Sequence, residues 1–539
     1  MLKRFICAIT VVALASSIWY VAYTTDDPDF SQKSSEEFSE DSEGTEGETS
    51  GTANIPATDS DALTLWYTDE ALTDYLQSVA LSYQHDKGVK VNIVLRDGVS
   101  FLEDINAASV GTNTPSGDVM PDLYITSHDS LLRAYLSGLA SVITDPDGVV
   151  VPSMFPETAI DAVTCYDHAV AYPLYYETNF FLYNKTYMAS IAQNKIEADA
   201  DIAMAEEATE ELLENGAPAE EAQEISTEDA SDGEDTVSSE DLETSEEENP
   251  MGEEDQVADA AVLEKLATMI PQTIEDIKTF ANNYDAPEAV ESVFKWDVTD
   301  IFYNYFFVGN YMEVGGPHGD NAAIFNIYNS QAVECLSAYQ GMNQFFSIDP
   351  KVDNYDNILQ DFIDGKMVFT VATTDAIARI HEAKNRGEFD FEYGVSTLPD
   401  ISSLLKARGL SVTDAVAING YSDKKADANM LATYLVNNKV SDLYLRSGKV
   451  ACNKTVKYDD PEIANVMDEY KKSVPLPKMV EAANYWVQLE IAFMKVWEGS
   501  DPDETLKELS DTIGAQIEEI RASLPTQESF HAGAGSFIQ

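Results

Sequence analysis

Aromatic, acidic and imidazole side chains stand just after predicted strands in this sequence. Trp66 and Tyr67 end the apolar run ALTLWY, and His128 and Asp129 follow the run DLYI. Because ligands of open α/β sheets bind at the carboxyl ends of the strands, these side chains could contact a ligand. Aromatic rings offer stacking faces, while imidazole and carboxylate groups offer hydrogen bonds. For the two aromatics the alternative is core packing, with one of them facing inward.

The sequence carries no recognisable catalytic motif. It has no G-x-S-x-G elbow, no H-E-x-x-H motif, no G-x-x-x-x-G-K-[ST] loop and no zinc pattern of Cys and His. His381-Glu382 lacks a second histidine, and the six histidines do not cluster. A glycosidase needs only two carboxylates, so 96 acidic residues leave that alternative open. We expect a binding protein rather than an enzyme, with no cofactor and no metal.

Strands and helices alternate through the folded part of the chain, which predicts an α/β protein with a largely parallel sheet. The first elements are a strand at 62–67, a helix at 70–83, a strand at 89–94, a helix at 99–108 and a strand at 122–125. Later ones are short strands at 169–172 and 180–183 around Pro173, a strand at 367–372 and helices at 485–497 and 502–524. A helix from Ile274 is expected to be capped by Thr273, with Asp276 completing a capping box.

The net charge of −64 is concentrated in two segments. Residues 26–56 carry ten acids and one Lys, and residues 196–259 carry 26 acids and no base. These segments contain few apolar residues, so we expect a disordered acidic linker at 26–60 and a disordered acidic insert at 196–259. The negative charge also excludes general nucleic-acid binding, since it repels phosphate backbones.

Residues 5–23 form an uncharged apolar run preceded by Lys3 and Arg4, the pattern of a secretory signal or a membrane anchor. Ala13-Leu14-Ala15 offers a cleavage site, but the apolar run continues well past it. We favour an anchor or an inefficiently cleaved signal within 1–25 over clean secretion. The early position of Cys7 disfavours lipidation. Most of the chain is then expected on the extracellular face of a bacterial membrane.

Three cysteines lie beyond the apolar run, namely Cys165, Cys335 and Cys452. An odd number at wide spacing is not a disulfide framework. One bridge and buried free thiols both remain open.

Several stretches between Leu63 and Leu524 together resemble extracellular solute-binding proteins of ABC transporters, of the maltose-binding type. No single stretch is specific for this family, but the order in which the stretches follow one another over some 400 residues is specific for it. In chain order they are LTLWYTDEALTDYLQSVALSYQHDKGVKVNIV, PDLYITSHDSLLRAYLSGLASVI, HAVAYPLYYETNFFLYNKTYM, PQTIEDIKTF, FIDGKMVFTV, EYGVSTLPD and VPLPKMVEAANYW. The resemblance is interrupted by the acidic insert.

The resemblance implies a periplasmic-binding-protein-like fold of two α/β lobes with a ligand cleft between them. Lobe one is expected at 61–173 plus 396–447, and lobe two at 178–392 plus 450–525, with a loose tail at 526–539. Glu177 matches the acidic residue that binds sugar hydroxyls in the family, next to Tyr176. Trp486 matches an aromatic residue that stacks on a sugar ring. Where the family often has GPW, this chain has Thr373-Thr374-Asp375, so the aromatic platform is missing and the contact expected there is a polar one from Thr374 or Asp375.

The function implied by the resemblance is that of a monomeric receptor for an ABC permease. A small ligand, most readily a carbohydrate, would be captured by hinge closure of the two lobes. A peptide or polyamine ligand stays open, as does a membrane-tethered sensor or adhesion protein that uses the same fold.

Overall fold

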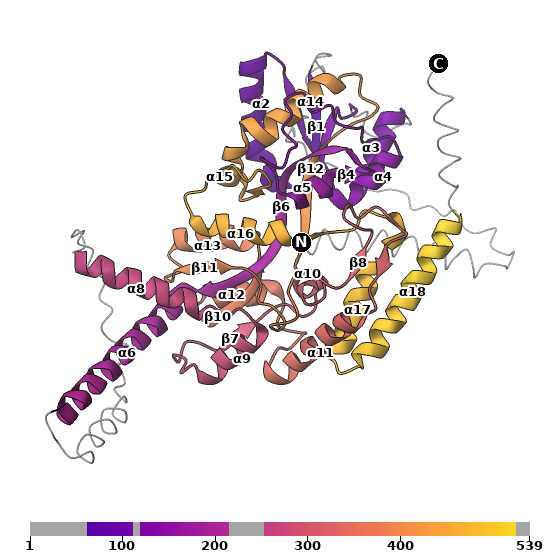
Figure 1. Cartoon of the computed structure of the whole chain (residues 1–539). Helices are drawn as coiled ribbons and strands as arrows, with labels where there is room; N and C mark the ends of the chain where they lie inside the picture. Colours follow the sequence, from indigo (N-terminus) through magenta and orange to yellow (C-terminus); the bar gives the residue numbers. More distant parts are fainter. Residues whose placement is uncertain (1–61, 112–118, 215–252, 524–539) are drawn as a thin grey trace, which may run out of the picture. The chain divides into compact units, whose positions relative to one another are not determined.

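The computed structural model describes residues 62–111, 119–214 and 253–523 (Figure 1). Contacts divide the chain into two compact units. The first unit extends to Thr178 and includes Thr299–Gln340 and the chain from Arg408; the second comprises Asn179–Val298 and Gly341–Ala407. The segments expected at 1–25, 26–60 and 526–539 lie outside the described residues.

A mixed sheet with the order β2-β1-β3-β12-β6 forms the centre of the first unit. β1 pairs in parallel with β2 and β3, whereas β12 pairs antiparallel with β3 and β6. All five residues of β1 are buried, as expected for a strand covered on both faces. The strands are β1 (Leu63–Tyr67), β2 (Val91–Leu95), β3 (Leu123–Ser127), β6 (Ala171–Asn184), β12 (Leu410–Ile418), β13 (Val450–Ala451) and β14 (Val474–Pro475). Two short hairpins are β4 (Thr164–Cys165) with β5 (His168–Ala169) and β8 (Glu313–Val314) with β9 (Phe325–Asn326).

The second unit has a smaller sheet to which the end of β6 also belongs. β10 (Met367–Thr373) pairs in parallel with β7 (Ser292–Lys295) and antiparallel with β6, which also pairs with β11 (Tyr393–Ser396). Phe181 and Phe369 stack at 5.2 Å between ring centroids and are fully buried. Aromatic packing of this kind is the core of the second unit.

β6 corrects the expectation of two short strands around Pro173, because it is one continuous strand of 14 residues. Proline has no N–H to donate within a sheet, so it is tolerated at an irregularity. The pairing of β12 with β6 shifts register between Asp414 and Ala415, and Ala415 lies opposite Pro173. The bulge therefore lets the proline stay inside the strand.

Helices surround both sheets. Those of the first unit are α2 (Thr73–Lys87), α3 (Phe101–Val110), α4 (Leu131–Leu136), α5 (Glu157–Val163), α10 (Ile301–Asn304), α14 (Lys425–Thr433), α15 (Leu443–Ser447), α16 (Pro461–Lys472), α17 (Tyr485–Trp497) and α18 (Pro502–Ser523). Those of the second are α6 (Lys185–Glu214), α8 (Glu253–Met269), α9 (Ile274–Asn283), α12 (Tyr355–Ile363) and α13 (Asp375–Arg386), while α11 (Ser330–Phe345) belongs to both. The capping box of Thr273 and Asp276 at the start of α9 is confirmed.

The expectation of disorder throughout 196–259 is wrong at both ends of that segment. Residues up to Glu214 continue helix α6, and α8 begins at Glu253. The two helices contact each other, and Lys265 pairs with Asp199 at 2.7 Å. Ala and Glu favour helix. The buried side chain of Met188 anchors the first turn of α6, so the residues after it extend a helix that is already nucleated. Residues 215–252 lie outside the described part.

The two compact units divide the chain differently from the expected lobes, because the segment from 450 onward groups with the first unit. α16 packs against α5, and β14 pairs with β12. The segment Thr299–Gln340 joins the same unit, where the N–H of Lys478 donates to the carbonyl of Gly319 at 2.6 Å.

Within the described residues, no helix is long and apolar enough to cross a membrane. The apolar run 5–23 is not among them.

Candidate functional site

Four side chains of the first unit, Asp69, Tyr175, Glu177 and Lys449, form a partly buried cluster that we call the Lys449 cluster. The ammonium of Lys449 lies 2.9 Å from Asp69 Oδ2 and 3.3 Å from Glu177 Oε1. The hydroxyl of Tyr175 donates to Asp69 Oδ2 at 3.3 Å, and the Lys449 ammonium lies 5.1 Å from the centre of the Tyr175 ring. One cation thus holds two carboxylates and covers an aromatic face.

The local fold explains how these residues meet. Asp69 follows β1 and caps the short 3₁₀ helix Glu70–Leu72 by accepting from the N–H of Ala71. Lys449 follows Gly448, whose left-handed φ of 67° ends α15, and precedes β13, which pairs with β6. The side chains of Asp69, Glu177 and Lys449 are 16%, 11% and 19% exposed, so a ligand can still reach them.

Tyr176, which was expected beside Glu177, points to the other side of β6. It is fully buried and stacks on Tyr470 with ring centroids 3.8 Å apart. Neighbouring residues of a strand face opposite sides, so Tyr175 and Glu177 share a face and Tyr176 cannot join them. The expected site residue is therefore replaced by Tyr175, and Asp69 and Lys449 are members that sequence reasoning missed. Because side chains alternate between the two faces of a strand, Glu177 shares its face with Tyr175, and this alternation was the sequence signal for Tyr175.

Trp486 lies near the start of α17 in an aromatic group of the first unit. Its ring meets that of Tyr305 edge-on at 5.4 Å and that of Tyr485 at 4.9 Å. Tyr485 is fully buried, whereas Trp486 is partly exposed. The packing fixes the indole while leaving part of it accessible, which suits a stacking surface for an apolar ligand face.

Trp66 and Tyr67 are both buried, with exposures of 1% and 2%. The guanidinium of Arg96 lies 4.0 Å from the centre of the Trp66 ring, and the Tyr67 hydroxyl is hydrogen-bonded to Thr73 Oγ1 at 2.9 Å. Neither ring has an open face here, so core packing describes both, and we leave them out of the candidate site.

His128 connects segments of the first unit. Its Nε2 donates to the carbonyl of Leu476 and its Nδ1 accepts from the N–H of Thr413, each at 3.0 Å. Burial, reinforced by the nearby Lys478 cation, lowers the pKa of His128 to about 4. Because both ring nitrogens are engaged, we leave His128 out of the site; its neighbour Asp129 is exposed.

Lys478 anchors the same segment in front of α17. Its buried ammonium donates to the carbonyls of Asp161 and Ala162 at 2.8 and 3.2 Å, at the end of α5. Burial lowers the pKa of Lys478 to about 8. The segment that leads to Trp486 is therefore held by side chains on two sides.

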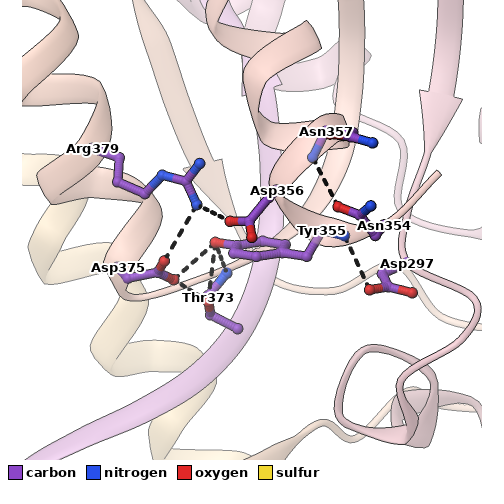
Figure 2. A network of polar contacts seen from close by, with 8 residues as sticks. All are labelled: Asp297, Asn354, Tyr355, Asp356, Asn357, Thr373, Asp375 and Arg379. Atoms are coloured by element: carbon purple, nitrogen blue, oxygen red, sulfur yellow. Dashed lines mark hydrogen bonds and ion pairs between the residues drawn. The ribbon is translucent and has the colours of Figure 1, made fainter. Parts of the chain in front are cut away.

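In the second unit, Thr374 lies beside a network of polar contacts (Figure 2). The hydroxyl of Tyr355 donates to Asp375 Oδ1 at 2.8 Å, and Thr373 Oγ1 contacts both groups. Arg379 donates to Asp356 at 2.8 Å and lies 3.9 Å from Asp375. Thr374 itself is 4% exposed and gives α13 no side-chain cap. The most exposed charged group here is Asp356, whose side chain is 81% exposed, while Asp375 and Arg379 are partly exposed and Thr374 is buried.

Cys165, Cys335 and Cys452 are all free and buried. Across residues 62–111, 119–214 and 253–523, no group of three His, Cys, Asp or Glu side chains could hold a metal ion.

No family model matches the chain, and no curated protein matches it. Solved structures do. An extracellular solute-binding protein from Staphylococcus aureus, solved in complex with maltose, is 18% identical with a TM-score of 0.61; the alignment covers 86% of this chain and 100% of that one. A cyclo/maltodextrin-binding protein with maltotetraose is 17% identical with a TM-score of 0.60, covering 86% and 98%. A maltose-binding periplasmic protein from Listeria monocytogenes, with maltose, is 19% identical with a TM-score of 0.59, covering 86% and 99%. The chain therefore has the fold of these extracellular sugar-binding proteins.

Proposed function

We propose that this protein is the extracellular receptor of an ABC importer and that it binds a carbohydrate. The observation that carries the proposal is the coverage of the fold: nearly the whole length of each sugar-binding neighbour aligns with this chain. The Lys449 cluster and Trp486 add the chemistry a sugar needs. Carboxylate oxygens accept hydrogen bonds from hydroxyl groups, and an indole stacks on the C–H face of a sugar ring.

Isothermal titration calorimetry and thermal shift with maltose, maltotriose and maltotetraose test the proposal. A ligand that binds the folded state alone raises the melting temperature, by an amount that grows with its concentration. Spermidine and a tripeptide serve as comparison ligands. The carbohydrate proposal fails if a broad panel of oligosaccharides gives no heat and no shift while one of these comparison ligands gives both.

Capture by closure of two lobes remains part of this proposal. Small-angle X-ray scattering with and without a bound sugar measures it: closure lowers the radius of gyration, whereas an unchanged value at saturation contradicts it. Binding without cleavage is also proposed, and release of shorter sugars during prolonged incubation with maltotetraose would contradict it.

Delivery to a permease, tethering through residues 5–23 and a monomeric state complete the proposal. A tether near the permease raises the effective concentration of the receptor. Transport in vesicles that contain the cognate permease, measured with the full chain and with a chain starting at residue 26, tests delivery and tethering together. A receptor that binds sugar but supports no transport favours the sensor or adhesion alternative.

A further inference from the structure

In the Lys449 cluster, the protein's own ammonium group lies between two carboxylates. Without Lys449, a positively charged ligand could occupy that place. Asp69 and Glu177 each lie within 3.3 Å of the Lys449 ammonium, so their contacting oxygens are within about 6 Å of each other. Two carboxylates this close repel each other and attract any cation. Lys449 fills that role and leaves the cluster with a single net negative charge.

The position of the ammonium is fixed by its surroundings. The N–H of Lys449 donates to Ser447 Oγ at 3.3 Å, and the next residue, Val450, pairs with Tyr176 of β6. The ring of Tyr175 lies beneath the ammonium at 5.1 Å. With its side chain 19% exposed, Lys449 is only partly hydrated and holds a defined position between the acids.

We infer that Lys449 determines the charge class of the ligand, so that the site accepts neutral polyhydroxyl compounds and disfavours amines. This inference rests on the proposed function. A ligand amine at Asp69 or Glu177 must displace the Lys449 ammonium or sit beside it, and the two like charges repel in a partly desolvated site. A hydroxyl group carries no charge, so the Lys449 ammonium does not repel it and need not be displaced by it.

The test compares the neutral maltotriose with two cations, chitotriose (the trimer of glucosamine) and spermidine, by titration calorimetry at pH 7. The wild-type protein should bind maltotriose at least about tenfold more tightly than either cation. In Lys449→Met, which keeps the apolar stem without the charge, that preference should fall by about tenfold or more, because the carboxylates then attract the cations. Lys449→Arg should keep the wild-type preference. Lys471→Met is the matched control, since Lys471 is an exposed lysine that pairs with Asp468 on α16.

An unchanged preference in a folded Lys449→Met protein overturns the inference and leaves the proposed function standing. A wild-type protein that binds spermidine and no sugar overturns both. If Lys449→Met does not fold, Glu177→Gln is the second variant, and it leaves Lys449 with one carboxylate. Binding of chitotriose should then weaken more than binding of maltotriose. The opposite order contradicts the inference.

Discussion

The Nε2 atom of His128 donates a hydrogen bond to the carbonyl oxygen of Leu476 at a distance of 3.0 Å. The two residues are 348 positions apart in the sequence. This bond joins the end of β3 to the segment in front of α17. The other ring nitrogen accepts from Thr413 on β12, so a neutral imidazole satisfies both contacts. A protonated ring would present an N–H to the N–H of Thr413, which is a repulsive arrangement.

Acidification should therefore destabilise the protein through His128. The unfolded chain binds a proton near the ordinary pKa of about 6.5, whereas the folded protein does so only near a pKa of about 4. Above pH ~6.5 neither state is protonated, so the stability is fully present. Between pH ~6.5 and ~4 the unfolded state alone gains the proton, and the free energy of unfolding falls by about 2–3 kcal/mol. Denaturant unfolding at pH 7 and pH 4.5 measures the loss.

His128→Gln is the control for this prediction, because glutamine does not titrate. Its free energy of unfolding should fall less between the two pH values than that of the wild type. An equal fall in both proteins would assign the acid sensitivity to other groups.

Replacing Trp486 should weaken sugar binding. Trp486→Ala removes the partly exposed indole and should raise the Kd for maltotriose by roughly tenfold or more, because a stacking surface is lost. Trp486→Phe keeps a smaller ring and should retain much of the affinity. Calorimetric titration measures both, and a wild-type Kd in a folded Trp486→Ala protein would remove Trp486 from the site.

The network in Figure 2 should contribute to stability through the Tyr355 hydroxyl. Tyr355→Phe removes the donor to Asp375 and should lower the free energy of unfolding by about 1 kcal/mol. Tyr421→Phe is the comparison, since the Tyr421 hydroxyl makes only a long 3.4 Å contact to Ser137 at the surface. Urea unfolding that ranks the two losses in the opposite order would contradict this view of the network.

Excision of residues 215–252, with a short Gly-Ser linker in their place, should leave sugar binding intact. It removes 14 acidic and no basic residues, while α6 and α8 keep their mutual packing and the Lys265–Asp199 pair. We expect an unchanged Kd for maltotriose and a melting temperature within about 2 °C, since the entropic cost of closing a long connection changes only slowly with its length. A larger excision, 196–259, also removes much of α6 and should lower the melting temperature. A lost affinity after the smaller excision would give the acidic segment a role in binding.

Hydrophobic periodicity and local capping depend on neighbouring residues, so they were enough to predict an α/β protein and the capping box at Thr273. The two-lobed fold was expected from the resemblance and not from periodicity. The prediction of two strands around Pro173 was wrong, because β6 carries a bulge next to this proline and stays paired with β12, more than 200 residues away in sequence. The low apolar content of residues 196–214 predicted disorder, but these residues belong to helix α6, and Asp199 pairs with Lys265 of α8.

The composition of the site was decided by the tertiary structure. Period-two alternation could have selected Tyr175 over Tyr176, but no local pattern could bring Lys449 to Glu177, 272 residues earlier in the chain. The same holds for Trp66, Tyr67 and His128, whose types suit ligand binding and whose burial shows packing instead. Residue types define which contacts are chemically available, and only the folded chain decides which of them are used within the protein and which remain for a ligand.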